Sequence, residues 1–193
     1  MKTSPITHRL YYLLAPQSAV ITTRAHGIDI SKYDLEFVPE NATGQLDFVW
    51  QRISYRLTRD EAFEKLLPGV MRVPIRMGYH YLNSGTDWKA QADAYLSYIS
   101  GFEYHAHAVD FEGTANVLSQ SFAYDAWRWR DYVEQKTGKI THLYTGRYLY
   151  QDWLIPSQKT YGINWGAVPL WHAQYFYVPN PDGTPNMPTG LGT

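Results

Sequence analysis

Six short apolar runs alternate with helix-like segments along most of this chain, and this alternation constrains the fold more than any other feature. The runs predict β-strands over residues 26–31, 46–54, 75–82, 105–112, 140–146 and 167–176. Strands that alternate with helices favour a parallel sheet with crossover helices, and a closed barrel is the natural solution for this many units. A complete (β/α)8 barrel needs about 250 residues. The 193-residue chain therefore predicts an α/β fold of the (β/α) barrel, TIM-barrel type, which is irregular and incomplete.

Helical signals fill the gaps between several of these runs. In residues 58–67, Thr58 is the expected N-cap and Pro68 the expected end of the helix. Residues 86–100 place their apolar side chains on one helical face, and residues 121–137 form a longer helix that a glycine closes. These helices are expected to cover the outside of the barrel.

The chain is expected to form one barrel domain over residues 25–193, after a lead-in over residues 1–24. The apolar stretch LYYLLA in this lead-in is too short for a convincing secretory signal peptide and is followed by Pro16. No run reaches the roughly 18 apolar residues that a membrane helix needs. The segment after residue 177 is rich in Pro and Gly, which argues against a central strand there.

Charge and residue types exclude several classes of partner. With 17 Lys and Arg against 18 Asp and Glu, the net charge is -1. No basic cluster appears, so phosphate-driven binding of nucleic acid is not expected. The absence of cysteine excludes disulfides and thiolate metal sites. Aromatic residues reach 16%, which suits either a large aromatic core or stacking platforms for a hydroxyl-rich ligand such as a sugar.

Two carboxylates, Asp110 and Glu112 in HAVDFEGT, stand two residues apart at the end of the fourth run. Side chains two apart on a strand point to the same face, and parallel barrels carry their active sites at the carboxyl ends of the strands. Asp29 occupies the equivalent place in the first run. Three carboxylates that converge at one mouth would raise at least one pKa and keep an acid protonated for general-acid work. The alternative is that all three are solvated strand ends.

A metal site built from His105, His107 and the two neighbouring acids is the rival hypothesis. Strand parity opposes it, because the histidines are at odd positions and the acids at even positions. His80 is similarly expected to be a core or supporting histidine rather than a base. We therefore expect no metal.

Aromatic side chains are expected to rim the same mouth, where a sugar ring can stack on them. The candidates for substrate binding are Tyr33, Tyr79, Tyr81, Tyr144, Trp171 and Tyr175. For each of them, filling of the barrel interior is the alternative.

Six blocks in order carry a resemblance to glycoside hydrolase family 25, the lysozymes or N-acetylmuramidases of bacteria, phages and fungi. They are GIDISKYD, FVWQRISYRLTRDEAFEKL, GYHYLNSGTDWKAQADAYL, AVDFEGT, TGKITHLYTGRYLY and PLWHAQY, and they span residues 26–176. The resemblance implies a (β/α) barrel that cleaves the β-1,4 bond between N-acetylmuramic acid and N-acetylglucosamine in peptidoglycan. It implies no metal or cofactor, and it implies action at the bacterial cell wall, either extracellular or phage-delivered. From the charge pattern and the apolar runs we expect no nucleic acid and no membrane as partners.

The resemblance also implies roles for individual residues. Glu112 matches the general acid and Asp110 its partner, which either orients the N-acetyl group of the substrate for neighbouring-group attack or acts as the base. Asp29 matches the acid of the first strand. Tyr79 matches an aromatic residue near the cleaved sugar.

The chain departs from the family pattern after its sixth run. Family members continue there through two more strands with a further acid, so we expect an activity reduced by the missing acid. We also expect that the lead-in, self-association or a partner chain completes the barrel. The motif R-A-S-x-G reads RISYR here. The alternative function is a catalytically impaired module of the same fold that binds wall glycan or has a structural role in a phage particle.

Overall fold

The computed structural model describes residues 9–12, 25–34, 46–113 and 117–173. Its strands form one sheet with the order β1-β2-β3-β5-β6-β7-β8, and β4 pairs only with β3. Six strands run parallel: β2 (Ala25–Ile30), β3 (Phe48–Tyr55), β5 (Ile75–Tyr81), β6 (Ala106–Asp110), β7 (Thr141–Gly146) and β8 (Leu170–Ala173). The six expected strands and their parallel arrangement are confirmed, as a curled and incomplete barrel.

Two further strands extend the sheet. β1 (Arg9–Tyr12) comes from the segment ahead of the first expected strand and pairs antiparallel with β2. β4 (Thr58–Arg59) forms a short antiparallel pair with the end of β3. The departure from the family pattern expected after the sixth run concerns residues 174–193, which lie outside the described residues.

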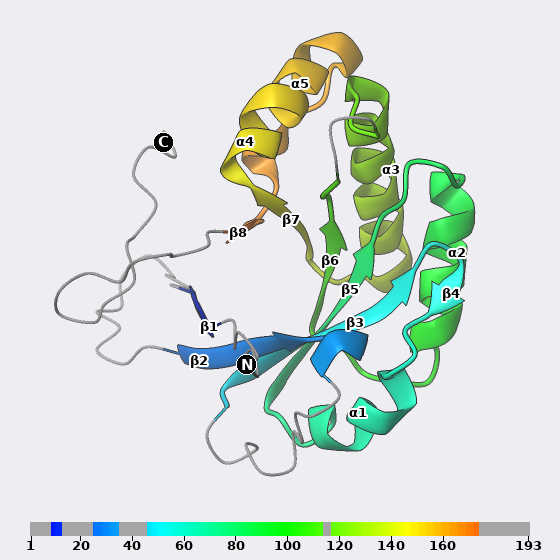
Figure 1. The fold of residues 1–193 in the computed structure, drawn as a ribbon, viewed down its shortest axis with the longest axis vertical. Helices are drawn as coiled ribbons and strands as arrows, with labels where there is room; N and C mark the ends of the chain where they lie inside the picture. Colours follow the sequence, from blue (N-terminus) through cyan, green and yellow to red (C-terminus); the bar gives the residue numbers. More distant parts are fainter. Residues whose placement is uncertain (1–8, 13–24, 35–45, 114–116, 174–193) are drawn as a thin grey trace, which may run out of the picture.

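The helices follow the outer, convex side of the curled sheet (Figure 1). They are α1 (Phe63–Val70), α2 (Trp88–Ile99), α3 (Gln120–Thr137), α4 (Arg147–Leu149), the π-helix η3 (Tyr150–Leu154) and α5 (Ile155–Tyr161), with short 3-10 turns η1 (Lys32–Asp34) and η4 (Trp165–Ala167). Within the described ranges, no helix has the length and hydrophobicity needed to cross a membrane.

The sheet is buried on both faces, as parallel sheets usually are. Its outer face packs against the helices through aliphatic side chains such as Ile53, Val109 and Leu143. Its inner face carries a separate cluster made of Phe48, Trp50, Tyr79, Ala108 and Trp171. The inner face is therefore mostly aromatic.

Trp50 on β3 and Trp171 on β8 meet across the inside of the barrel. Their ring centroids lie 4.5 Å apart and their planes differ by 20°, although β5, β6 and β7 separate the two strands in the sheet. Both side chains are almost completely buried. Stacked indoles therefore fill the interior of the incomplete barrel.

The helix expected over residues 58–67 is wrong in both of its boundaries. Arg56 has a positive φ of 52°, which turns the chain into a hairpin and places Thr58 in β4 rather than at a helix N-cap. Helix α1 begins at Phe63, after Asp60 accepts hydrogen bonds from the next turn. Pro68 lies inside α1 and does not end it, because the Met71 N–H still donates to the Leu67 carbonyl.

The other two helices agree with the sequence signals. Ser119 caps α3 through the Phe122 N–H, and Gly138 ends this helix with a φ of 65°. Helix α2 buries Gln91 and three apolar side chains, whereas Trp88, expected on the same buried face, is only partly buried and lies edge-on to the Tyr132 ring of α3.

Candidate active site

One row of residues on the inner face brings several candidate side chains side by side. In the register of the parallel strands, Tyr81 pairs with Asp110, Asp110 with Tyr144, and Tyr144 with Trp171. Residues paired in this way point to the same face of a parallel sheet. β6 ends at Asp110, two residues earlier than expected, so Glu112 lies just beyond the strand rather than within it.

Asp110 is the carboxyl of this row, and its environment is strongly perturbed. Its side chain is buried, and its Oδ1 atom has no hydrogen-bond partner among the described residues. Burial raises the pKa of Asp110 well above its usual range, and the charges of Glu112 and Asp29 raise it further, while Arg52 opposes them. Asp110 therefore lies within electrostatic reach of both Glu112 and Asp29.

Two tyrosines border the carboxylates. Burial raises the pKa of Tyr79, with further contributions from Asp29 and Asp110. The same causes act on Tyr81, which is half-buried and lies near Asp110 and Glu112. Both phenols therefore stay protonated at neutral pH and are available as hydrogen-bond donors beside the acids.

Arg52 connects this cluster to a buried counter-ion. It is paired in register with Tyr79 on the next strand, and its Nε donates to Asp60 Oδ2 at 2.5 Å. Their side chains are only 10% and 1% exposed. The guanidinium also lies 5.2 Å from the centre of the Tyr33 ring.

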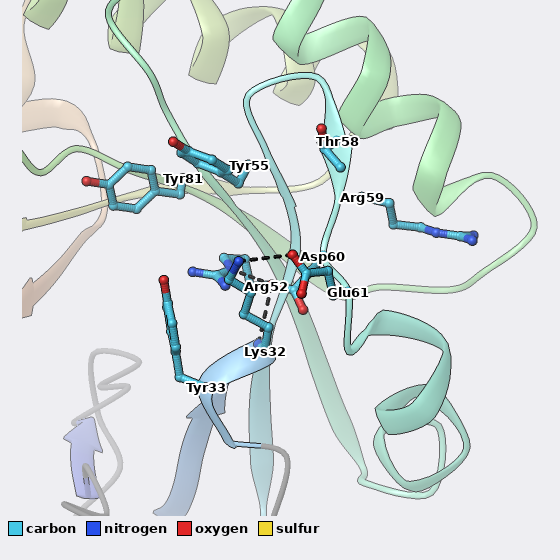
Figure 2. Close-up of a pocket in the computed structure, with 9 residues that line it drawn as sticks. All are labelled: Lys32, Tyr33, Arg52, Tyr55, Thr58, Arg59, Asp60, Glu61 and Tyr81. Carbon is cyan, nitrogen blue, oxygen red and sulfur yellow. Dashed lines mark hydrogen bonds and ion pairs between the residues drawn. The ribbon is translucent and has the colours of Figure 1, made fainter.

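Figure 2 shows an open groove of about 420 Å³, and Tyr81 connects it to the acid cluster. Its lining consists of Lys32, Tyr33, Arg52, Tyr55, Thr58, Arg59, Asp60, Glu61 and Tyr81. Tyr33, which is 79% exposed, stands on one side of Arg52. Tyr81 stands on the other side, with its ring edge-on to Tyr55 at 5.5 Å. Tyr81 thus borders both the groove and the carboxylates.

The remaining aromatic candidates have different surroundings. Tyr144 lies 4.6 Å from Trp171, whose ring is also edge-on to Tyr79 at 5.8 Å. Trp171 is 2% exposed and fills the interior. Tyr175 lies outside the described residues. Of the six aromatic candidates, only the exposed Tyr33 and the half-buried Tyr81 line the described groove, so the candidates differ in their access to a ligand.

His80 and His107 lie on the helix side of the sheet, as strand parity predicts for His107. His107 Nδ1 is 2.7 Å from the Tyr95 hydroxyl, and burial lowers the pKa of His107 to about 4. His80 stacks on Trp129 and lies between Ser54 and Gln91 in a buried hydrogen-bond chain. Burial also lowers the pKa of His80 to about 4. In the described part of the chain, no three His, Cys, Asp or Glu side chains gather closely enough to hold a metal ion.

Sequence reasoning missed Trp50, Arg52, Tyr55 and Asp60. The second run, LDFVWQRIS, is apolar on both faces, so it contains no alternation that separates inward from outward residues. The pairing of Arg52 with Tyr79 depends on the register between β3 and β5, which shifts at a bulge between Arg52 and Ser54. No local signal in the sequence reveals this shift.

Comparison with solved structures gives the fold. A family 25 glycosyl hydrolase from Bacillus anthracis is 14% identical, with a TM-score of 0.66 over 89% of this chain and 76% of that one. A muramidase from Trichobolus zukalii is 23% identical, with a TM-score of 0.63 over 79% and 78%. The catalytic domain of endolysin ply40 from Listeria monocytogenes bacteriophage P40 is also 23% identical, with a TM-score of 0.64 over 86% and 82%.

The family assignment comes from the sequence itself. No curated protein matches the chain. The family model described as Glycosyl hydrolases family 25 matches residues 28–188, which is most of the chain and includes all three carboxylates of the cluster. The chain therefore belongs to glycosyl hydrolases family 25 and is a glycoside hydrolase.

Proposed function

We propose that this peptidoglycan hydrolase is a muramidase that cleaves the β-1,4 bond between N-acetylmuramic acid and N-acetylglucosamine. Its main support is Asp110, a buried carboxyl at the carboxyl end of β6 whose pKa Glu112 and Asp29 both raise. Parallel barrels place their chemistry at this end of the strands. Structural neighbours with the same fold include proteins named muramidase and endolysin.

Glu112 is the general acid in this proposal. It lies beyond the end of β6 and is more exposed than Asp110, so it is the carboxyl of the pair that a glycosidic oxygen can approach. Because a second negative charge on the pair is unfavourable, one proton stays on it at a pH where two isolated carboxyls would both be ionised. The pair shares this proton, and Glu112 passes it to the leaving oxygen as the bond to the anomeric carbon breaks, which leaves both carboxyls ionised.

Asp110 and Asp29 complete the reaction. A water molecule supplies a hydroxyl group to the anomeric carbon, and its proton returns to the carboxyl pair, so the site is restored after each turnover. In one alternative, Asp110 accepts the proton of the water directly. In the other, Asp110 orients the N-acetyl group of the sugar, and the carbonyl oxygen of this group attacks the anomeric carbon before the water does. Asp29 supplies negative charge near the developing positive charge of the sugar ring.

Tyr79, Tyr81 and Tyr33 are the proposed substrate contacts near the acids. The first two donate hydrogen bonds from protonated phenols, and the exposed ring of Tyr33 offers a surface for stacking. Tyr144 and Trp171 support them from the interior. The enzyme acts at the bacterial cell wall, and we propose that it is either extracellular or delivered there by a phage.

Product analysis tests the function directly. The wild-type protein is expected to reduce the turbidity of purified peptidoglycan and to release fragments with reducing N-acetylmuramic acid ends, identified by mass spectrometry. Fragments with reducing N-acetylglucosamine ends would contradict the assigned bond. A folded protein that binds peptidoglycan but releases nothing would instead indicate the impaired module.

The raised pKa of Asp110 predicts a pH dependence of stability. At pH values above about 3.9, which is the pKa of Asp in the unfolded chain, Asp110 is still protonated in the folded state. Between this pH and the folded pKa of Asp110, the folded state therefore binds more protons than the unfolded state. The contribution of Asp110 to the free energy of unfolding is complete below pH ~3.9 and is lost as the pH rises through the folded pKa of Asp110. The free energy of unfolding falls by at most about 1.4 kcal/mol per pH unit in this range. Asp110→Asn is expected to abolish this loss.

Urea unfolding of the wild type and Asp110→Asn across pH 4 to 8 measures the effect. The difference in stability between the two proteins should grow in favour of the variant as the pH rises. A difference that stays constant with pH would show that Asp110 ionises normally in the fold.

A further inference from the structure

Three cations gather in the groove beside the acid cluster. Lys32, Arg52 and Arg59 line it together with two acids, Asp60 and Glu61. Tyr81 forms a wall of the same groove, and the charges of the carboxylates at the barrel mouth contribute to its raised pKa. A ligand that extends from the mouth past Tyr81 therefore passes from a negatively charged region to one rich in positive charge.

The cations differ in how firmly their partners hold them. The Arg52 side chain is held in place, because it pairs with Asp60 and both side chains are buried. Lys32 pairs with Glu61 at 3.0 Å, and the Glu61 side chain is 76% exposed. Such exposed ion pairs contribute little to stability and exchange partners at small cost. An incoming anion can therefore replace Glu61 beside Lys32.

Arg59 is in the same situation. Its side chain is 41% exposed, and its partner Glu64 on α1 is 73% exposed. Glu64 does not belong to the groove lining. Arg59 points away from Arg52 in Figure 2, and its guanidinium lies 5.4 Å from the centre of the Phe63 ring. To meet a ligand in the groove it must turn from Glu64 and from this ring.

The shape of the groove suits a substituent attached to a sugar. Tyr33 and the pair of Tyr55 and Tyr81 stand on opposite sides of Arg52 (Figure 2). The volume of about 420 Å³ is within the usual range for a small-molecule site. Aromatic walls with a cationic floor accommodate a group that has both an apolar part and a negative charge.

We infer that this groove is an anion subsite that binds a carboxylate-bearing substituent of the glycan, with Arg52 as its fixed cation and Lys32 and Arg59 as exchangeable ones. This subsite presupposes the proposed action on peptidoglycan. Two sources of carboxylate exist there. One is the lactyl group of N-acetylmuramic acid units without a peptide, and the other is the free carboxylates of a peptide attached to the lactyl group as an amide. The acids at the barrel mouth repel either carboxylate, and the cations of the groove attract it.

Calorimetric binding of defined disaccharides to the full-length protein tests the subsite. The probes are an N-acetylglucosaminyl-N-acetylmuramic acid disaccharide with a peptide, the same disaccharide without it, and forms of both in which the carboxylates are amidated. Lys32→Gln and Arg59→Gln should each weaken binding of the carboxylate forms by about 2- to 5-fold and leave binding of the amidated forms unchanged. Raising the salt concentration should weaken only the carboxylate forms.

Two matched variants sharpen the result. Glu61→Gln removes the competitor of Lys32 and should strengthen binding of the carboxylate forms. Lys159→Gln removes the same charge from α5, away from the groove lining, and should change nothing. If the amidated disaccharides bind as tightly as the carboxylate forms and Lys32→Gln has no effect, the subsite does not exist.

The probes also separate the two sources and the two proposals. If the carboxylate form binds more tightly than the amidated form only when the peptide is present, the groove is assigned to peptide carboxylates. If this preference persists in the disaccharide without the peptide, the groove is assigned to the lactyl carboxylate. Cleavage is measured independently on purified peptidoglycan, because the disaccharides lack the bond from N-acetylmuramic acid to N-acetylglucosamine. Failure of cleavage with intact carboxylate preference would overturn the muramidase activity alone, and cleavage without preference would overturn the subsite alone.

Discussion

Glu112→Gln is expected to slow peptidoglycan hydrolysis by about 100- to 10,000-fold, which is the usual contribution of a general acid. Glutamine has nearly the same size and retains hydrogen bonding, but it has no proton to transfer at neutral pH. Binding of glycan and the free energy of unfolding should therefore change little. Initial rates of turbidity loss, compared with binding to insoluble peptidoglycan, measure the two effects separately.

Glu103→Gln is a suitable matched control for this variant. Glu103 precedes β6 and its side chain is 73% exposed, so the same chemical change occurs at the opposite end of the strand from Asp110. This control should hydrolyse peptidoglycan at the wild-type rate. Equal rates for Glu112→Gln and Glu103→Gln, in proteins with the same thermal midpoint, would remove Glu112 from the mechanism.

Trp171→Ala is expected to lower the free energy of unfolding by about 3–5 kcal/mol, the range for large aromatic side chains deleted from a core. Trp171 is 2% exposed, and its ring stacks on Trp50 at 4.5 Å and meets Tyr144 at 4.6 Å. Removal of the indole leaves a cavity between β3 and β8 that the rigid strands cannot close. Urea denaturation monitored by circular dichroism measures the loss.

Tyr148→Ala provides the comparison for an aromatic residue on the surface. Its side chain is 77% exposed, so its removal should change the free energy of unfolding by no more than about 0.5 kcal/mol. Trp171→Phe retains part of the ring and should lie between the two alanine variants. A stable Trp171→Ala protein with weakened glycan binding would instead make Trp171 a substrate contact, as its place near the acids first suggested.

The strands were predictable because a parallel sheet buried on both faces leaves continuous apolar runs in the sequence. The convergence of Asp29 and Asp110 follows from the same order of strands, since both lie near the carboxyl ends of parallel strands. Strand parity also placed His107 correctly, because the side-chain period of two holds within β6. The strands, the positions of the two acids and the side of His107 could be predicted because each depends only on a short segment or on a regular repeat in the sequence.

The groove was not predictable, because it depends on contacts between distant segments. Thr58 has the local signature of a helix N-cap, but the turn at Arg56 draws it into a hairpin with β3. Arg52 reads as a polar interruption of an apolar run until its register with Tyr79 and its ion pair with Asp60 are known. In both cases the pairing of strands determines the structure, and the local propensity of the segment does not.

Asp60 has a consequence for how a ligand meets the groove. One carboxylate oxygen accepts from Arg52 Nε, and the other accepts from the Ala62 N–H at 2.9 Å, just before α1 begins. The rotamer freedom of Arg52 is therefore lost when α1 folds onto the sheet, and it is not lost again when a ligand binds. The floor of the groove is preorganised by a carboxylate that also holds the turn ahead of α1, so flexibility at this site is confined to the exposed side chains at its rim.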